Sequence, residues 1–238
     1  MTAAVKISVV IPTYNEEANV PILLQKTHGI LQIAGYAHEL IVVDDGSTDA
    51  TRTRILSLAA SIPEILLIPR DNEKGLASAM VRGYNEARGE YLAAMDADLA
   101  HDPEHLPEIL KLLDSGEADF VIGSRYVSGS SFEGKPLLNK ITSLVGQFLV
   151  KIILRIKVKD TSNNYRVFRR AVWEKIKNHL HPDGNIMLTE IVYAATKNNF
   201  VIREIPIIYR ERRAGKSKLN IFKETIRFFK NIFKIKFS

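Results

Sequence analysis

The chain contains no cysteine among its 238 residues. Disulfide bonds and thiolate metal sites are therefore excluded, and a reducing cell interior is the natural compartment. The first residues, MTAAVKISVVIP, hold one lysine and a short apolar run that ends at Pro12. This pattern predicts a first β-strand rather than a signal peptide.

Two nucleotide-binding motifs are also missing. No GxGxxG follows the first apolar run, and no GxxxxGK[ST] occurs anywhere, so dinucleotide and P-loop sites lose their main physical support. The longest charge-free apolar run in the second half of the chain, ITSLVGQFLV (141–150), ends at Lys151. We expect no segment that spans a bilayer.

Positive charge is concentrated at one end of the chain. Lys and Arg total 33 against 27 acidic residues, and residues 218–238 hold six basic residues and one acidic residue, with Phe and Ile between them. A nucleic-acid-binding protein would spread basic residues over a recognition surface, whereas a basic end with apolar residues suits an anionic membrane. We expect a peripheral membrane protein with no nucleic-acid partner.

Apolar runs of strand length alternate with helical patterns along the first half. Strands are predicted at 7–12, 39–45, 64–69, 91–98 and 119–126. This order is typical of an α/β fold with a doubly wound parallel sheet, and the length fits a single domain. The second half predicts a helix at 137–157, a short strand at 165–170, a helix at 187–198, a strand at 201–210 and an amphipathic helix at 219–236.

Polar clusters follow the predicted strands. They are Thr13–Glu16, Asp44–Ser47, Asp96–Asp98 and Ser124–Tyr126. Ligands of such sheets bind at the carboxyl ends of the strands, so we expect one site to gather all four clusters.

Asp96 and Asp98 are the strongest candidates for chemistry. Two positions apart on an extended backbone, they point to the same side. Neighbouring carboxylates repel unless a cation joins them, and oxygen ligands suit Mg²⁺ or Mn²⁺ bound together with substrate phosphates. Asp44 and Asp45 could accept from a nucleobase and a ribose. The alternatives are a helix cap with a spare acid for the first pair and an ordinary turn for the second.

Five stretches together resemble a known family. They are VVIPTYNEEANV, ELIVVDDGSTDAT, KGLASAMVRGYNEARGEYLAAMDADLAHDPE, VIGSRYVSG and RRAGKSKL. In order and spacing they are similar to glycosyltransferase family 2, in its dolichol-phosphate mannose synthase branch, over nearly the full length. The resemblance implies a GT-A fold, which is Rossmann-like with a mostly parallel central sheet, together with a nucleotide-sugar donor, a divalent cation and a polyprenyl phosphate acceptor.

The resemblance also implies roles for individual residues. The nucleotide would lie near Pro12, Tyr14, Glu16, Asp44, Asp45, Lys74, Gly75 and Asp96, and Mg²⁺ or Mn²⁺ would bind Asp98 with Asp96. Phosphates of donor or acceptor would contact Arg125, Asn139, Lys140, Ser143, Arg212 and Lys218. Arginine suits this work because its planar fork binds phosphate oxygens in pairs. A structural salt bridge is the alternative for Arg125, and a solvated helix face for the terminal bases.

Three residues depart from the family pattern. Ala100 stands where a Gln commonly helps to hold the metal, so His101 or water would have to compensate. Asn139 stands where an Arg is frequent, with Lys140 next to it. Asn164 replaces a usual Gly, which is tolerable because Asn enters left-handed backbone conformations.

The acceptor determines whether a base is needed. A phosphate monoester has a second pKa of about 6 and is already a nucleophile. A hydroxyl acceptor would need a carboxylate base, for which Glu190 is the candidate, with pairing inside its helix as the alternative. The chain lacks the QxxRW pattern of processive synthases, which favours transfer of a single sugar.

The sequence therefore predicts an inverting, metal-dependent transferase that moves mannose from GDP-mannose to dolichyl or polyprenyl phosphate. The alternatives are a UDP-glucose-dependent polyprenyl-phosphate glucosyltransferase, a family 2 transferase with a hydroxyl acceptor, and a catalytically silent binding subunit. We expect the cytoplasmic face of a membrane as the location, reached through helices 137–157 and 219–236 lying on the surface or through a membrane partner subunit.

Overall fold

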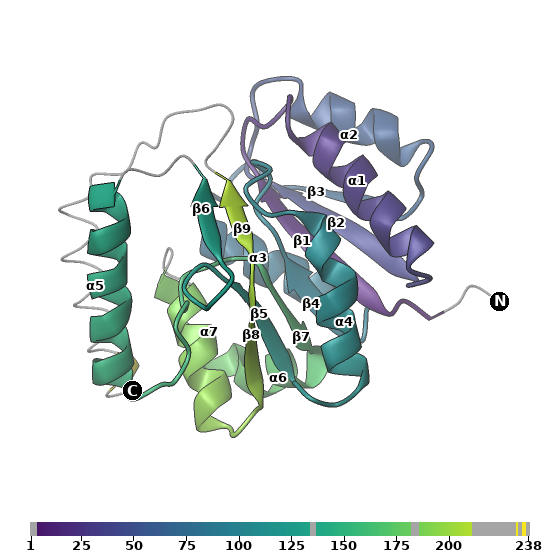
Figure 1. Ribbon diagram of the computed structural model, residues 1–238. Coiled ribbons are helices and arrows are strands. Elements are labelled where there is room, and N and C mark those ends of the chain that lie inside the picture. The colour runs from purple at the N-terminus through teal and green to yellow at the C-terminus, as the bar shows by residue number, and fades with distance from the viewer. Residues whose placement is uncertain (1–3, 134–136, 182–185, 211–231, 233–234, 237–238) are drawn as a thin grey trace.

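The computed structural model describes residues 4–133, 137–181, 186–210, 232 and 235–236. A seven-stranded sheet forms the middle layer, and helices cover both of its faces (Figure 1). The GT-A prediction of a mostly parallel sheet with flanking helices is confirmed.

The sheet has the strand order β3-β2-β1-β4-β7-β5-β8. Its members are β1 (Ile7–Thr13), β2 (His38–Asp44), β3 (Ile65–Pro69), β4 (Tyr91–Ala94), β5 (Phe120–Ser124), β7 (Arg166–Arg169) and β8 (Ile202–Pro206). Strand β7 runs antiparallel to both β4 and β5, and the other neighbouring pairs are parallel. A small second sheet pairs β6 (Ser131–Glu133) with β9 (Ile208–Arg210).

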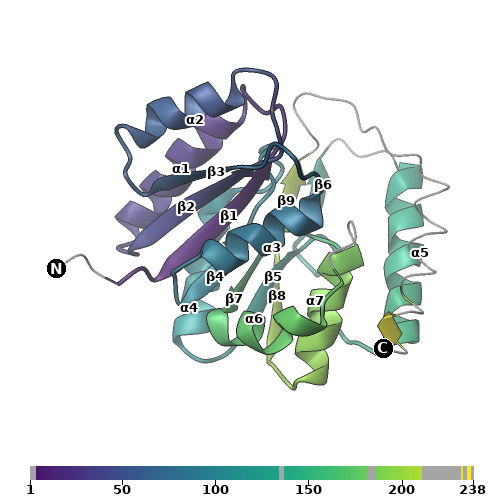
Figure 2. The same ribbon diagram turned by 180° about the vertical axis from the view of Figure 1, so that it is seen from behind.

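Helices form the two outer layers. Helices α1 (Val20–Ile33), α2 (Thr51–Ala59) and α4 (Leu106–Asp114) pack on one face, and a short 3₁₀ turn, η1 (Pro103–His105), leads into α4. Helices α3 (Leu76–Glu86), α6 (Arg170–Ile176) and α7 (Ile186–Lys197) pack on the other face, with η2 (Lys177–His179) after α6 (Figure 2). Helix α5 (Leu137–Leu154) stands at the side of the molecule.

The central strands are apolar on both sides because both sheet faces are covered. In β1, Val9 and Ile11 join the core under α1 and α4, while Val10 joins the core under α3. This double burial explains the continuous apolar run ISVVIP. Gly83 lets α3 approach β1, because a Cβ atom at this position would lie 2.3 Å from Cγ1 of Val10.

Most element predictions are confirmed, and several are wrong in detail. The strand predicted at 91–98 ends at Ala94, so Asp96 lies beyond the strand and Asp98 lies in a turn. The single strand predicted at 201–210 is divided at Ile207 into β8 and β9, which belong to different sheets. The sequence missed β6 and α6.

The two predicted surface helices have different outcomes. Helix 137–157 is present as α5 but ends at Leu154, because Arg155 takes a left-handed conformation with φ of 55°. Helix 219–236 lies outside the described residues apart from 232, 235 and 236. Among the described helices, none combines the length and the apolar character needed to cross a bilayer.

Candidate active site

The predicted polar clusters follow strands whose carboxyl ends point to the same edge of the sheet. Thr13 is paired in register with Asp44 on the neighbouring strand, and the N–H of Asp45 donates to the Thr13 carbonyl at 2.9 Å. On the other side of β1, the N–H of Met95 donates to the Val10 carbonyl at 3.2 Å, just before Asp96. Parallel pairing of β1 with β2 and β4 therefore places both acidic pairs at one edge.

Asp44 is fully buried and is held by protein donors. The Ser47 hydroxyl and the Nε of Arg52, at 2.5 Å, both donate to its carboxylate. Arg52 also reaches Asp71 at 2.6 Å, so the guanidinium joins the end of β2 to the segment after β3. The nucleobase role of Asp44 stays a prediction, and it would require these donors to share the carboxylate.

Asp45 connects β2 to the start of α3. Its carboxylate accepts from the N–H of Gly75 at 2.8 Å and lies 3.2 Å from Nη1 of Arg70. Burial raises the pKa of Asp45, and the Gly75 hydrogen bond and the Arg70 charge only partly offset this effect. Arg70 is itself buried and donates to the Ser78 hydroxyl at 2.7 Å. Sequence reasoning missed Arg70, although a lone basic residue directly after a predicted strand was the available signal.

The remaining predicted nucleotide residues surround this cluster. The amino group of Lys74 lies 5.5 Å from the ring centre of Tyr14, which is exposed. The Glu16 carboxylate accepts from the Asn19 side chain at 2.7 Å, and Pro12 is paired with Val43 in the sheet. The loop after β1 and the loop before α3 therefore meet, as the nucleotide prediction requires.

Asp96 and Asp98 differ in their surroundings. The Asp96 side chain is 34% exposed, and its Oδ1 accepts from the Asn164 amide at 2.9 Å. Asp98 is 5% exposed, and its Oδ1 accepts from the N–H of Ala100 at 3.1 Å. Leu99, between Asp98 and Ala100, has φ of 63°, and this left-handed residue turns the chain back toward the Asp98 carboxylate.

His101 fixes the backbone of this turn. Its Nδ1 accepts from the N–H of Asp96 at 3.1 Å, so the ring proton lies on Nε2, which donates to the Asn163 side chain at 2.8 Å. The ring is 1% exposed and stacks on Tyr165 with centres 5.2 Å apart. Both nitrogens are thus engaged, so this geometry gives His101 a positioning role and does not support the hypothesis that it replaces a metal ligand.

Asp96 and Asp98 suit a divalent cation that binds the protein through two carboxylates and takes its other ligands from water and substrate. Within the described part of the chain, no cluster of three or more His, Asp or Glu side chains could enclose a metal ion. Mg²⁺ and similar ions commonly bind one or two carboxylates and complete their shell with water and substrate phosphates. The oxygens of Asp96 and Asp98 suit this second kind of site.

Arg125 forms a buried ion pair. Its Nε and Nη2 each donate to the Asp160 carboxylate at 2.8 Å, and Nη2 also donates to the Ser162 hydroxyl at 2.9 Å. Burial alone would lower the pKa of Arg125, but the hydrogen bonds and charge of Asp160 raise it above its ordinary value. The salt-bridge alternative describes this arrangement, and phosphate binding by Arg125 stays a prediction.

A buried polar loop, residues 160–164, organises this half of the site. Asp160, Thr161, Asn163 and Asn164 are all buried. The loop contacts Gln147 on α5 through Thr161, Arg125 through Asp160 and Asp96 through Asn164. Sequence reasoning missed its role, because the partners of this loop lie on distant elements.

Arg166 holds the same loop through hydrogen bonds to its backbone. It is fully buried, and its guanidinium donates to the backbone carbonyls of Asn163 and, at 2.8 Å, of Leu188 on α7. Burial lowers the pKa of Arg166 to about 10. The loop is therefore held to α7 as well as to α5.

The Glu190 carboxylate is paired with His181. Its carboxylate accepts from the backbone N–H of His181 and lies beside the ring Nδ1, both at 2.8 Å. His181 precedes α7, so the pairing differs from the one expected inside the helix, and a base role for Glu190 stays a prediction. Asn139, Lys140 and Ser143 lie in α5 with side chains outside the described set, and Arg212 and Lys218 lie outside the described residues.

A family model described as "Glycosyl transferase family 2" matches residues 8–177. The chain belongs to this family. The matched region contains both acidic pairs and Arg125, whereas Glu190, Arg212 and Lys218 lie beyond it. The family prediction made from five sequence stretches is confirmed.

Two curated relatives are similar to this family 2 chain over most of its length. A dolichol-phosphate mannosyltransferase of Pyrococcus furiosus is 38% identical over 216 residues, which are 90% of this chain and 59% of the relative. A polyprenol monophosphomannose synthase of Mycolicibacterium smegmatis is 34% identical over 217 residues, which are 89% of this chain and 80% of the relative. The chain thus spans less than two thirds of the Pyrococcus furiosus relative.

Solved structures share the fold of this family 2 chain. Glucosyl-3-phosphoglycerate synthase from Mycobacterium tuberculosis, in complex with phosphoglyceric acid, has a TM-score of 0.72 at 19% identity, covering 97% of this chain and 79% of that one. The same enzyme with Mn²⁺, UDP and glucosyl-3-phosphoglycerate has a TM-score of 0.69 at 19% identity, covering 97% and 78%.

Proposed function

We propose that this chain is an inverting, divalent-metal-dependent transferase that moves a mannosyl group from GDP-mannose to dolichyl or another polyprenyl phosphate. The observation that carries the proposal is the placement of Asp96 and Asp98 after β4, at the sheet edge that also holds Asp44 and Asp45. The names of the two curated relatives support the mannosyl donor and the polyprenyl phosphate acceptor.

The acidic pair has the metal role in this proposal. Asp98 and Asp96 would hold Mg²⁺ or Mn²⁺, which when bound stabilises negative charge on a nucleoside diphosphate leaving group. His101 and Asn164 hold the backbone and side chain of Asp96, so the protein fixes one ligand before substrate arrives.

The nucleotide would lie over the loops after β1 and before α3. Tyr14 offers an exposed ring, and the Lys74 ammonium 5.5 Å from that ring supplies positive charge for an anionic donor. Asp45 fixes the backbone of Gly75 and so orients the loop that carries Lys74. These contacts favour binding of an anionic nucleotide at this end of the edge.

The acceptor would be its own nucleophile. A phosphate monoester is charged near neutral pH, so displacement at the anomeric carbon with inversion needs no protein base. The pairing of Glu190 with His181 agrees with a reaction that leaves this carboxylate unused. The acceptor phosphate would contact Asn139, Lys140, Ser143, Arg212 and Lys218, and the enzyme would work at the cytoplasmic face of a membrane, with or without a partner subunit.

A UDP-sugar donor is the second candidate. It is favoured by the solved relatives of the same fold that hold UDP or UDP-glucose with Mn²⁺. A hydroxyl acceptor is less favoured here, because the candidate base Glu190 is already paired.

Titration calorimetry with GDP-mannose and UDP-glucose, each with and without Mn²⁺, tests the donor and the metal together. We expect binding of GDP-mannose that depends on Mn²⁺, followed by inverting transfer to a short polyprenyl phosphate. Mn²⁺-dependent binding of UDP-glucose alone would reassign the donor. Indifference to both nucleotides would contradict the enzymatic proposal and support a silent family member.

A further inference from the structure

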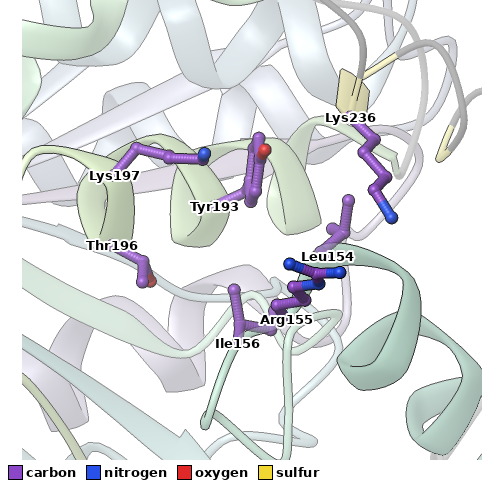
Figure 3. Close-up of a pocket in the computed structure, with 7 residues that line it drawn as sticks. All are labelled: Leu154, Arg155, Ile156, Tyr193, Thr196, Lys197 and Lys236. Atoms are coloured by element: carbon purple, nitrogen blue, oxygen red, sulfur yellow. The ribbon is translucent and has the colours of Figure 1, made fainter.

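A second, basic site lies away from the acidic pairs. A pocket of about 420 Å³ opens between the C-terminal ends of α5 and α7 (Figure 3). Arg155, Lys197 and Lys236 line it, and the described residues of its lining include no carboxylate. The Lys197 ammonium lies 5.5 Å from the ring centre of Tyr193, whose hydroxyl is a further donor (Figure 3). The pocket therefore concentrates positive charge and hydrogen-bond donors.

The pocket is separate from the candidate active site. The middle of α5 contacts the 160–164 loop through Gln147, whereas the pocket begins at Leu154, the last residue of the helix. Helix α5 has 18 residues and a length of about 27 Å, and it starts after β6 and runs back along the molecule (Figure 1). A ligand in the pocket would thus contact the C-terminal end of α5.

Helix ends account for part of this charge. Basic side chains near a helix C-terminus are stabilised by the helix dipole, which explains one cation on each of α5 and α7. Lys236 comes from a third segment and adds a third basic side chain to the lining. The chain from Lys151 to Lys159 also holds four basic residues and no acidic residue.

An exposed apolar face lies on the same helix. Leu144, Phe148 and Ile152 recur every four residues on α5, and their exposed fractions are 49%, 62% and 57%. Large apolar residues along one helix face, followed by basic residues at its end, are typical of helices that lie in the boundary between lipid headgroups and acyl chains.

We propose that the pocket binds the phosphate headgroup of an anionic glycerophospholipid while the exposed face of α5 enters the bilayer surface. Charge complementarity selects this occupant, because three cations and a phenol match a phosphate diester and the adjoining apolar face matches acyl chains. The proposal does not rest on sugar transfer. Lipid binding needs no nucleotide or metal, so its failure and the failure of the transferase proposal are distinguishable.

Vesicle co-sedimentation of the full chain tests the site. We compare vesicles of phosphatidylcholine with vesicles of phosphatidylcholine and phosphatidylglycerol, for wild type and for the double variant Arg155→Gln, Lys197→Gln. Each basic residue near an anionic surface changes partitioning roughly fivefold, so we expect the double variant to bind the anionic vesicles about 30-fold more weakly. The charge-preserving pair Arg155→Lys, Lys197→Arg should keep most of the binding.

The matched control removes two charges elsewhere. Lys111 and Lys175 are exposed on α4 and α6, so Lys111→Gln with Lys175→Gln lowers the net charge equally but should keep most of the binding. Equal losses in both double variants, or no loss in either, would overturn the site. Glycerol 3-phosphate is also added without vesicles. If it raises the melting temperature of wild type but not of the pocket variant, the lipid assignment is overturned in favour of a soluble phosphate. Lys236→Gln alone repeats the test should the double variant fail to fold.

Discussion

At the residue scale, the two carboxylates of the acidic pair are held in unequal ways. Asp96 is oriented by Asn164 and by the His101 ring, while Asp98 is nearly buried and accepts one backbone N–H. The two oxygens of a carboxylate offer several acceptor positions, so a cation can share them with protein donors. This difference makes Asp98 the sharper position to test.

We expect Asp98→Ala to abolish transfer and to leave the fold intact. The lost hydrogen bond to the Ala100 N–H costs about 1 kcal/mol of unfolding free energy, which a domain of this size tolerates. Transfer assays and Mn²⁺-dependent nucleotide binding measure the effect, and circular dichroism checks the fold. Glu108→Ala, which removes an exposed acid on α4, is the control. Full activity of Asp98→Ala would remove the metal role from this residue.

The ion pair of Arg125 with Asp160 can be separated into structural and functional parts. Asp160→Asn leaves a buried guanidinium without its counter-charge, so we expect a loss of about 3 kcal/mol in unfolding free energy. Adding Arg125→Met should recover part of this loss, because the uncompensated charge is gone. Urea unfolding measures both effects, and Arg125→Met alone completes the double-mutant cycle.

The transfer activity of the folded double variant decides the role of Arg125. If Arg125 only holds the loop, the double variant should keep measurable transfer and an unchanged KM for the acceptor. A large rise in that KM alone would assign phosphate binding to Arg125.

The sequence predicted which acids stand at the sheet edge but not what holds them. Strand-length apolar runs ending in Asp44 and Asp96 were sufficient to place these residues, because parallel strands share an edge. The partner of Asp96 is Asn164, 68 positions later, and no periodicity links the two. Such long-range polar contacts depend on the finished fold, so single-sequence reasoning did not find them.

At the element scale, the distance between α3 and β1 depends on one missing side chain. We expect Gly83→Ala to lower the unfolding free energy by about 1–3 kcal/mol, because its Cβ atom would lie 2.3 Å from Val10 and 3.2 Å from Val43. Urea denaturation measures the change. An unchanged midpoint would mean that α3 can move away from the sheet at little cost.

Gly29→Ala in the interior of α1 is the matched control. An added Cβ atom meets nothing within 4 Å, so helix propensity alone should raise the unfolding free energy by about 0.5–1 kcal/mol. Opposite signs for the two substitutions would separate packing from propensity.

Elements were predictable where one pattern covered one element. The run VIREIPIIYR reads as a single strand, but Ile207 divides it because β8 pairs with β5 and β9 pairs with β6. Residue types that favour strands do not indicate which sheet a strand joins. The role of the DTSNN loop was missed for a related reason, since polar residues are buried there by partners on other elements.

At the scale of the whole molecule, a charged cluster lies at the amino ends of β1 and β4, opposite the candidate site. Asp114 accepts from the hydroxyls of Tyr91 at 2.8 Å and Tyr36 at 2.9 Å, and its carboxylate lies 3.1 Å from the Lys6 ammonium. Burial raises the pKa of Asp114, but these hydrogen bonds and the Lys6 charge outweigh burial and lower it. Four distant parts of the chain are thereby tied together.

This cluster predicts a pH dependence of stability. A lowered pKa in the folded state means that Asp114 stabilises the fold above its unfolded pKa of about 3.9 and ceases to do so as pH falls through the folded value. Asp114→Asn should therefore be less stable than wild type near neutral pH, by less than about 1 kcal/mol because the group is more than a third exposed. Urea midpoints measured down to acidic pH should converge, and a constant gap between the two proteins would contradict the assignment.

Strand β7 also sets an order of events during synthesis. The first 94 residues contain β1 to β4, whose parallel pairs can form as soon as they leave the ribosome. Strand β5 joins that sheet only through β7, so its hydrogen bonds must wait until residue 169 has emerged. The nascent chain therefore carries the acidic half of the candidate site long before the loop that fixes Asp96 exists, and the site is completed late, with a strand that runs against its neighbours.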